Sequence, residues 1–318
     1  MLILDRAQVE SLLDMDALIA SLAPAMMELS AGRVSMPQRM AAQVEGKGLL
    51  GVMPAYLPAS GTLSCKLVSV FPGNGAAGLP THQAVVMLFD AASGAPLAML
   101  DGASITALRT AAGSALATKL LARDDAKVLL LIGTGVQALA HARAIPRVRR
   151  IGEFRVMGRD PGRLAAFVQT LMAESHCPIK AVAPGAQAFA GADIVCATTH
   201  AEAPVVKGEW LLPGTHVNSV GLNAKGQELD AEAVRRATLV VESRAAALAP
   251  PPAGANELAG TEVHAEVGEI LSGKRPGRSG PEEITLYKSV GVAVQDAVAA
   301  QLVYDLARER GIGREAPL

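Results

Sequence analysis

A glycine-rich segment at residues 132–138, IGTGVQA, has the spacing of a dinucleotide-binding loop. Gly133 and Gly135, with Ala138 in the third small position, fit the pattern G-x-G-x-x-A. The first glycine permits a tight turn, the second lets the backbone approach a pyrophosphate, and Ala138 lets the next helix pack closely on the preceding strand. A glycine turn that binds no nucleotide is the alternative. The continuous apolar run KVLLLIG before the turn is the context that a binding loop requires, so the sequence favours a dinucleotide site.

The end of the next strand pattern, FRVM, bears on which nicotinamide cofactor the loop suits. NAD sites usually carry an acidic residue there, which binds the ribose hydroxyls. Here the expected position is Gly158, and the guanidinium of the next residue, Arg159, can pair with a 2′-phosphate. This favours NADP(H). NAD(H) stays possible, because a shift of two residues would let Asp160 bind the ribose; alternatively, Arg159 is a solvated loop residue and Asp160 caps the next helix.

Three cations lie in otherwise apolar stretches: Arg39 in MPQRM, Lys66 in CKLVS and Arg109 in ALRTAAG. Long charged side chains are rarely buried in such places without an anionic partner. A substrate carboxylate would be such a partner, and arginine offers it a fork of parallel N–H donors. For each residue taken alone, an exposed charge or an internal ion pair is the simpler interpretation.

The composition excludes several classes of protein. The 29 Lys and Arg residues nearly balance the 30 Asp and Glu residues, and no basic stripe with interleaved aromatics is present, which argues against a nucleic-acid partner. The three cysteines, Cys65, Cys177 and Cys196, lie far apart without metal-ligand spacing, so we expect no metal site and reduced thiols in a cytoplasmic protein. No apolar run approaches the length of a membrane span, so we expect no membrane partner.

The elements that must position these residues change character along the chain. The first segment predicts a helix that begins at a capping box of Asp5 and Gln8 and ends near Gly32. Short apolar runs broken by glycine and proline over residues 36–100 predict a mostly antiparallel sheet, with DAASGAP as a hairpin turn. A helix rich in small residues follows from about Ser104 to Ala122.

Beyond residue 126, strand patterns alternate with helix patterns. The strands are KVLLLIG, FRVM, IKAV, DIVCATT, HVNSVG and TLVVES. This alternation predicts an α/β fold with a Rossmann-type, doubly wound parallel sheet. A last helix carries Val294, Val298, Leu302 and Leu306 on one stripe, and its return to the first domain would make that domain discontinuous.

These motifs together resemble the ornithine cyclodeaminase/mu-crystallin family over nearly the whole chain. The matching stretches include CKLVSVFPGN, the run from LPTHQAVVMLFD to ITALRTAAG, LLLIGTGVQA and GTHVNSVG. The resemblance implies an α+β substrate-binding and dimerisation domain over residues 1–115 with the returning helix 292–318, a Rossmann domain over 116–291, and a homodimer. It implies that Arg39, Lys66 and Arg109 hold a substrate carboxylate. It also implies cofactor contacts at Thr81, Gln137, Thr198, Val220 and Ser289.

One position departs from the cyclodeaminases of this family. They resemble one another in carrying an aspartate two residues past the glycine of the HVNSVG-like strand, where it acts as acid and base. Here that position is Asn223, and an amide does not exchange protons near neutral pH. Deamination needs repeated proton transfers, whereas reduction of a preformed C=N bond needs one hydride and one proton.

Asn223 therefore joins Lys66, Arg39 and Arg109 as a candidate catalytic-site residue in a different reaction. The resulting prediction is NAD(P)H-dependent reduction of a small α-imino acid, such as Δ1-pyrroline-2-carboxylate or Δ1-piperideine-2-carboxylate, to the L-amino acid. Lys66 is the candidate proton donor, since the pKa of a lysine falls when it is buried among other cations. Two alternatives stay open: NAD-dependent deamination of the ornithine cyclodeaminase or alanine dehydrogenase kind, and a non-enzymatic protein that holds NADPH or a small ligand, as mu-crystallin permits.

Overall fold

The computed structural model describes residues 1–223, 226–251 and 253–317. The chain forms two compact units: Met1–Arg109 together with Val292–Leu318, and Thr110–Gly291. The first boundary lies at Arg109, inside one continuous helix, α3 (Gly102–Leu121), and the expected boundary after residue 115 lies in the same helix. Because a helix that passes from one unit to the next shows no change of composition, its sequence does not mark the boundary.

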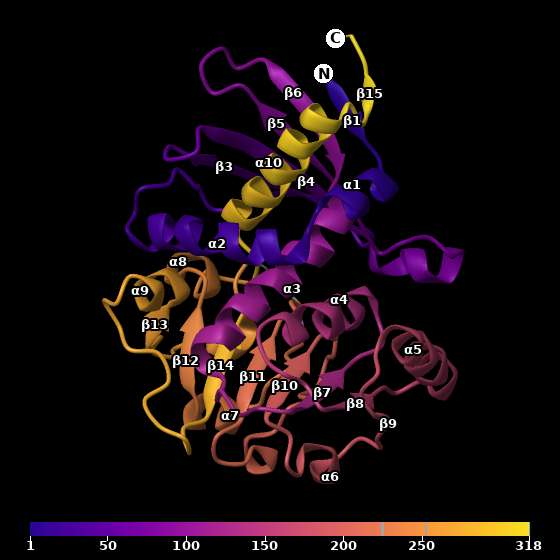
Figure 1. Cartoon of the computed structure of the whole chain (residues 1–318), viewed down its shortest axis with the longest axis vertical. Coiled ribbons are helices and arrows are strands. Elements are labelled where there is room, and N and C mark those ends of the chain that lie inside the picture. Colours follow the sequence, from indigo (N-terminus) through magenta and orange to yellow (C-terminus); the bar gives the residue numbers. More distant parts are fainter. Residues whose placement is uncertain (224–225, 252, 318) are drawn as a thin grey trace. The chain divides into compact units, whose positions relative to one another are not determined.

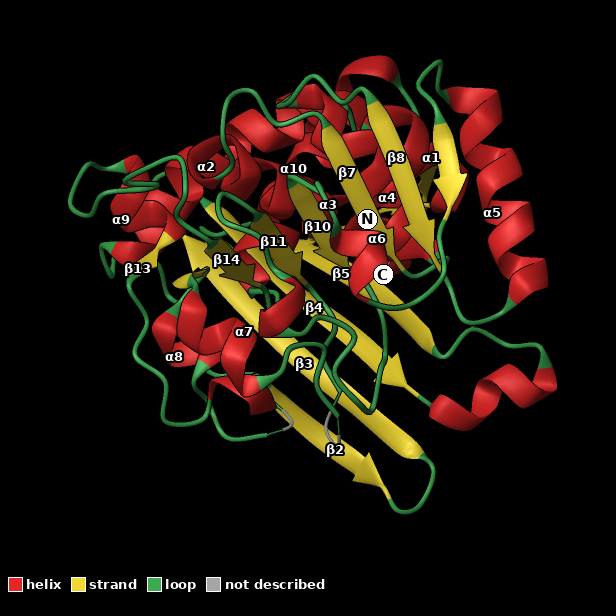
Figure 2. Cartoon of the chain, turned by 90° about the horizontal axis from the view of Figure 1, so that it is seen from below, coloured by secondary structure: helices red, strands yellow, loops and turns green. Residues whose placement is uncertain are grey.

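The first unit is built on one sheet. Its strands are β1 (Leu2–Leu4), β2 (Met40–Val44), β3 (Gly48–Leu57), β4 (Thr62–Val70), β5 (His82–Phe89), β6 (Pro96–Asp101) and β15 (Arg314–Glu315). Their order is β15-β1-β6-β5-β4-β3-β2, and β2, β3 and β4 can be followed side by side in Figure 2. Only the β1–β6 pair is parallel within the described residues, so the predicted mostly antiparallel sheet is confirmed.

The N-terminal helix of this unit is interrupted. The predicted capping box of Asp5 and Gln8 is present and starts α1 (Arg6–Leu12). A second helix, α2 (Met15–Ser30), then begins because the side chain of Asp14 accepts a hydrogen bond from the backbone N–H of Ala17. The prediction of one helix up to Gly32 was therefore wrong in this detail, since apolar periodicity continues across the break.

The last helix, α10 (Ala293–Arg310), belongs to the first unit. In Figure 1 it is the yellow helix that lies among the indigo and purple elements α2, β3, β4 and β5. The helix that the apolar stripe predicted is present, and its residues group with the first unit. Met53, Ala55 and Leu57 of β3 are buried, whereas the alternating residues on the other face of the strand are only half-buried.

The second unit is the predicted doubly wound parallel sheet. Its strands are β7 (Val128–Ile132), β8 (Glu153–Met157), β9 (Ile179–Ala181), β10 (Ile194–Ala197), β11 (His216–Ser219), β12 (Thr238–Val241), β13 (Ala265–Glu266) and β14 (Thr285–Lys288). Its longer helices are α4 (Val136–Ala144) and α5 (Pro161–Glu174), and its short ones are α6 (Ala186–Phe189), α7 (Ala231–Arg236), α8 (Arg244–Ala247) and α9 (Val267–Leu271).

The strand order in this unit is β13-β12-β14-β11-β10-β7-β8-β9, with every described pair parallel. The central strands β10 and β11 are buried at every residue, as a sheet covered on both faces requires. From β7 the chain adds β8 and β9 on one side of the sheet, and it then adds β10 on the other side of β7. In such sheets ligands bind beyond the carboxyl ends of the strands at the point where the strand order reverses.

Two arginines anchor the C-terminal end of α3 within the second unit. The guanidinium of Arg149 donates to the carbonyl oxygens of Lys119 and Ala122, and that of Arg278 donates to the carbonyl oxygen of Leu121. These carbonyls have no partner within the helix, and positive charge is favourable at a helix C-terminus. The C-terminal end of α3 is therefore held by two charged side chains of its own unit, the buried Arg149 and the half-buried Arg278.

Neither a membrane-spanning helix nor a metal-binding group is found in the part of the chain that the structure describes. No helix there combines the length and apolar character that crossing a bilayer requires. In the same residues, no three His, Cys, Asp or Glu side chains are grouped so that they could hold a metal ion.

Candidate active site

Lys66, Arg109 and Asp296 form a buried ionic cluster in the first unit. The Nζ atom of Lys66 lies 2.7 Å from Oδ2 of Asp296, and Nε of Arg109 lies 2.9 Å from Oδ1. The exposed fractions of the three side chains are 3%, 6% and 1%. They come from β4, α3 and the first turn of α10, so three distant segments of sequence converge on one carboxylate.

The elements explain why these side chains face one another. In β4 the buried residues alternate, and Lys66 occupies the buried phase together with Thr62 and Ser64. At the start of α10, the side-chain oxygen of Gln295 accepts from the N–H of Val292 and from Nη1 of Arg109. The first turn of α10 therefore supplies two acceptors for Arg109, one from Gln295 and one from Asp296.

The cluster carries more positive than negative charge. Burial lowers the pKa of Lys66 to about 8; the charge of Asp296 opposes this fall, and the charges of Arg109 and the half-buried Arg39 add to it. Burial acts to raise the pKa of Asp296, but the charges of Arg109 and Lys66 outweigh it and hold that pKa below its usual value. Two cations on one carboxylate, with the charge of Arg39 also acting on Lys66, suit the binding of a further anion.

The glycine loop of the second unit has the geometry that a pyrophosphate needs. Gly133 has φ +117°, and a Cβ there would lie 2.8 Å from Oγ1 of Thr198. A Cβ on Gly135 would meet no protein atom within 4 Å, so this position faces open space. Gly135 precedes α4 without a side-chain cap, which leaves the first N–H groups of the helix for a ligand, and Ala138 is fully buried. These features fit a bound dinucleotide.

Three predicted cofactor contacts follow neighbouring strands of the second unit. Thr198, Val220 and Ser289 come directly after β10, β11 and β14, at the edge of the sheet where the glycine loop follows β7. The hydroxyl of Thr198 donates to the carbonyl oxygen of Ile132, and the hydroxyl of Ser289 donates to the buried carboxylate of Glu242. The fold therefore brings these residues to one edge of the sheet, and their contact with a cofactor stays a prediction.

The other two predicted contacts lie elsewhere. Gln137 lies in the first turn of α4, where its carbonyl oxygen accepts from Nδ1 of His141. Thr81 belongs to the first unit and immediately precedes β5, with its hydroxyl 3.4 Å from Nδ1 of His82. Their roles also stay predictions.

The segment after β8 shows how the cofactor-selecting positions are occupied. The carboxylate of Asp160 accepts from the backbone N–H of Arg163 and caps α5, which was one of the interpretations of the sequence. A Cβ on Gly158 would lie 2.9 Å from Cγ2 of Thr134, so a side chain at the usual acid position would require Thr134 to move. Arg159 is exposed.

Asn223 is held by its amide group. Its Nδ2 lies 3.4 Å from the carbonyl oxygen of His200 and 3.3 Å from that of Ala201, and it donates to both. Its backbone carbonyl oxygen accepts from Nδ2 of Asn256 at 2.8 Å. An aspartate in the same place would turn a charged oxygen toward two carbonyl oxygens, so the local structure suits an amide.

Three buried acids of the described residues, Asp296, Glu228 and the Glu242 that binds Ser289, were not predicted from the sequence. Asp296 lies in the apolar stretch AVQDAVAA, and the criterion that identified Lys66, a charge among apolar residues, would have identified it too. Glu228 accepts hydrogen bonds from Thr199, Ser219 and Gly221, and so joins the loop after β10 to the loop after β11. The segment QELD gives no sign that this glutamate is buried.

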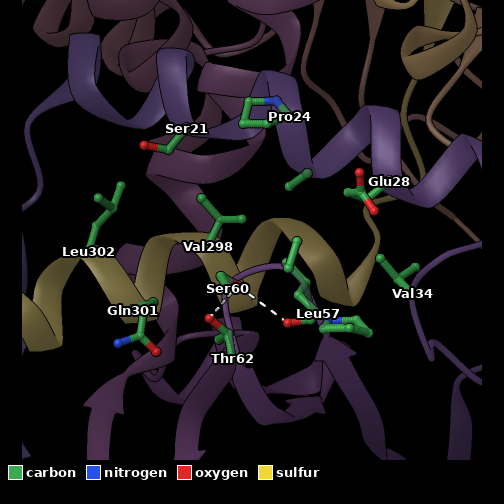
Figure 3. Close-up of a pocket in the computed structure, with 13 residues that line it drawn as sticks. Ser21, Pro24, Glu28, Val34, Leu57, Ser60, Thr62, Val298, Gln301 and Leu302 are labelled. Carbon is green, nitrogen blue, oxygen red and sulfur yellow. Dashed lines mark hydrogen bonds between the residues drawn. The ribbon is translucent and has the colours of Figure 1, made fainter.

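A separate cavity of about 340 Å³ lies in the first unit between α2, α10 and the turn from β3 to β4 (Figure 3). Its walls are mainly apolar, with Pro24 from α2 and Val298 from α10. Its one charged lining residue is Glu28, which is paired with Arg33. The cavity therefore lacks the cations that a carboxylate substrate needs.

Known proteins share both the sequence and this architecture. A model described as the ornithine cyclodeaminase/mu-crystallin family matches residues 1–311. The ketimine reductase mu-crystallin of Mus musculus is 41% identical over 276 residues, which is 86% of each protein. The structure of Thermococcus litoralis Δ1-pyrroline-2-carboxylate reductase in complex with NADH and L-proline matches with a TM-score of 0.93 and 39% identity, over 99% of this chain and 100% of that one.

An archaeal alanine dehydrogenase dimer with bound NAD matches with a TM-score of 0.88 and 34% identity, over 100% of this chain and 99% of that one. Relatives of this similarity over nearly the full length share a fold and a descent. The chain therefore belongs to the ornithine cyclodeaminase/mu-crystallin family.

Proposed function

We propose that this protein is an NAD(P)H-dependent reductase of a small cyclic α-imino acid, of the Δ1-pyrroline-2-carboxylate or Δ1-piperideine-2-carboxylate type. The observation that carries the proposal is the buried cluster in which Lys66 and Arg109 meet on Asp296. It offers a cationic site for a carboxylate and a lysine able to give up a proton. The similarity to a ketimine reductase and to a Δ1-pyrroline-2-carboxylate reductase supports the same reaction.

Lys66, Arg109 and Arg39 have different roles in the proposed reaction. Arg109 and Arg39 hold the substrate carboxylate, and this fixes the imine for reaction; positioning of this kind supplies much of the rate. Reduced nicotinamide supplies, when bound, the hydride that adds to the imine carbon. Lys66 donates the proton from Nζ to the imine nitrogen, which receives the electron pair of the C=N π bond, and then recovers a proton from water. With a pKa of about 8, Lys66 is largely protonated at neutral pH and is still a competent acid.

The cofactor is held by the second unit. Gly133, Gly135 and the N-terminal N–H groups of α4 would bind its pyrophosphate, because no side chain and no cap occupies that place. The further contacts that we propose are Gln137, Ala138, Thr198, Val220 and Ser289, with Thr81 from the first unit.

The hydrogen bonds and the chemistry of the Asn223 amide favour reduction over deamination. Its amide donates to two backbone carbonyls and has no proton to exchange near neutral pH. A cyclodeaminase needs an acid and base at the amino group that leaves. We therefore expect no release of ammonia from ornithine or alanine with NAD⁺.

The decisive assay is oxidation of NADPH and NADH, followed at the nicotinamide absorbance, with Δ1-pyrroline-2-carboxylate and Δ1-piperideine-2-carboxylate as substrates. We expect rapid oxidation that is faster with NADPH. If neither cofactor is oxidised with either imine, the proposed reaction is wrong. Ammonia release with NAD⁺ would then identify a deaminase, and tight NADPH binding without turnover would identify a binding protein.

We propose NADP(H) as the preferred cofactor and Arg159 as the residue that selects it. Replacing Arg159 with alanine should lower kcat/KM for NADPH by about 10- to 100-fold, since hydrogen bonds to charged groups contribute about 1.5–3 kcal/mol. The value for NADH should change little. Arg150→Ala, an exposed arginine of the same unit, is the matched control. An equal loss with both cofactors would contradict the role of Arg159.

We also propose that the protein is a homodimer. The face of the first sheet opposite the buried residues of β3 carries half-buried apolar side chains: Tyr56, Leu63, Leu67, Met87 and Met99. An apolar sheet face of this extent is typical of an interaction surface. The similar archaeal alanine dehydrogenase forms a dimer, which supports a second copy of this chain as the partner. The molar mass from light scattering tests this.

A further inference from the structure

Asp296 is the residue on which the cationic cluster is assembled. Its two carboxylate oxygens serve different cations, Oδ2 for Lys66 and Oδ1 for Arg109, at 2.7 and 2.9 Å. Its side chain is 1% exposed, so water does not weaken these contacts. It lies in the first turn of α10, where a negative charge is stabilised by the helix dipole.

We infer that Asp296 is a positioning residue for the reduction: its carboxylate holds the Lys66 ammonium charged and in place for proton donation to the imine nitrogen. It acts through Lys66 and does not touch the substrate. The inference rests on the proposed function and assigns a part in it to a residue that neither the family resemblance nor the glycine and cation motifs identified.

The charges around Lys66 require such an anion. The groups that act on it come from three elements: Arg109 from α3, Arg39 from the segment before β2, and Asp296 from α10. Burial and both arginines favour the neutral amine, and Asp296 is the one group among these that favours the ammonium. A lysine buried with two arginines and no carboxylate would lose its proton near neutral pH and could not act as the acid.

The geometry adds an orienting effect to the charge. Lysine has a flexible stem with several rotatable bonds, and one short ionic contact to a fixed carboxylate limits where its ammonium can lie. The carboxylate itself is fixed because Arg109 binds its other oxygen and also binds the neighbouring Gln295 at 3.1 Å. The Lys66 ammonium is therefore held by the Asp296 carboxylate, and this carboxylate is held in turn by Arg109.

The test is the pH dependence of kcat/KM for Δ1-pyrroline-2-carboxylate at saturating NADPH in the Asp296→Asn variant. In the unmodified protein, activity is full below the pKa of Lys66, about 8, and falls about tenfold per pH unit above it. In Asp296→Asn, this alkaline limb should begin at least about one pH unit lower, with at least about a fivefold loss relative to the unmodified protein at pH 8, where Lys66 of that protein is itself half protonated. The titration of the substrate is common to both proteins and cancels in the comparison.

A structural role alone would lower the rate equally at all pH values and leave the alkaline limb in place, and that result would overturn the inference. If the unmodified protein reduces neither imine, it is the proposed function that fails. Asp305→Asn, at an exposed position further along α10, is the matched control and should keep the original profile.

A second variant keeps the inference testable if Asp296→Asn does not fold. Asp296→Glu retains the charge but moves the carboxylate by one methylene. It should keep the alkaline limb near pH 8 while kcat falls, because the ammonium stays charged but is displaced. An unchanged kcat, or an alkaline limb moved to lower pH, would contradict the role assigned to Asp296.

Discussion

Replacing Lys66 with methionine should reduce imine reduction by about 1,000-fold or more while cofactor binding stays largely intact. Methionine keeps most of the volume of the side chain but removes the proton donor, and a positioned acid or base contributes about 100- to 10,000-fold. It also removes one charge that favours the substrate carboxylate. The residues that we propose to bind the cofactor lie mainly in the second unit, so their structure does not depend on Lys66. Turnover and NADPH binding, by fluorescence, measure the two effects separately.

The loss should come from chemistry and not from unfolding. Because burial lowers the pKa of Lys66 to about 8, its charged form costs folding free energy below that pH, and methionine removes this cost. Arg109 still pairs with Asp296 in the variant. Lys47→Met, at an exposed position of the same unit, is the control. Full activity in Lys66→Met would show that Lys66 is not the acid.

Replacing Gly135 with valine should abolish cofactor binding without disturbing the fold. The backbone there has φ −98° and ψ −172°, which any residue adopts, and a Cβ would meet no protein atom within 4 Å. The side chain would instead fill the space proposed for the pyrophosphate. Steric conflict of about 1–3 kcal/mol, with loss of a charged hydrogen bond, predicts about a 100-fold weaker affinity or more.

The control for this variant is Gly280→Val. Gly280 lies in the same unit, and a Cβ there also has open space around it. This variant should bind NADPH normally, and both variants should melt at temperatures close to that of the unmodified protein. If Gly135→Val binds NADPH with normal affinity, the loop is a structural turn and the cofactor lies elsewhere.

The second unit was largely predictable because its signals are local. A buried strand, VLLLI, is followed within a few residues by the glycine turn and then by a helix. Each of these three features follows from the residues of its own segment. Gly133 shows the limit of such reasoning. Its positive φ was implied by the tight turn, but its approach to Thr198 depends on the pairing of β7 with β10, which no local pattern contains.

The cationic cluster was only half predictable for the same reason. Charges in apolar stretches required partners, and this identified Lys66 and Arg109. The partner, Asp296, lies 187 residues from Arg109 along the chain, and only the return of α10 brings it there. In the N-terminal segment, apolar spacing continued past Asp14, so the capping that ends one helix and starts another could not be seen from periodicity.

The closeness of Gly158 to Thr134 constrains how an acidic residue can enter the position that usually binds the ribose of NAD. An aspartate at position 158, the usual route to NAD, would place Cβ 2.9 Å from Cγ2 of a threonine whose β-branched side chain has few alternative rotamers. A side chain at position 158 therefore requires Thr134 to shift or to be replaced by a smaller residue. Alanine or glycine at position 134 would make this room, in evolution as in protein engineering.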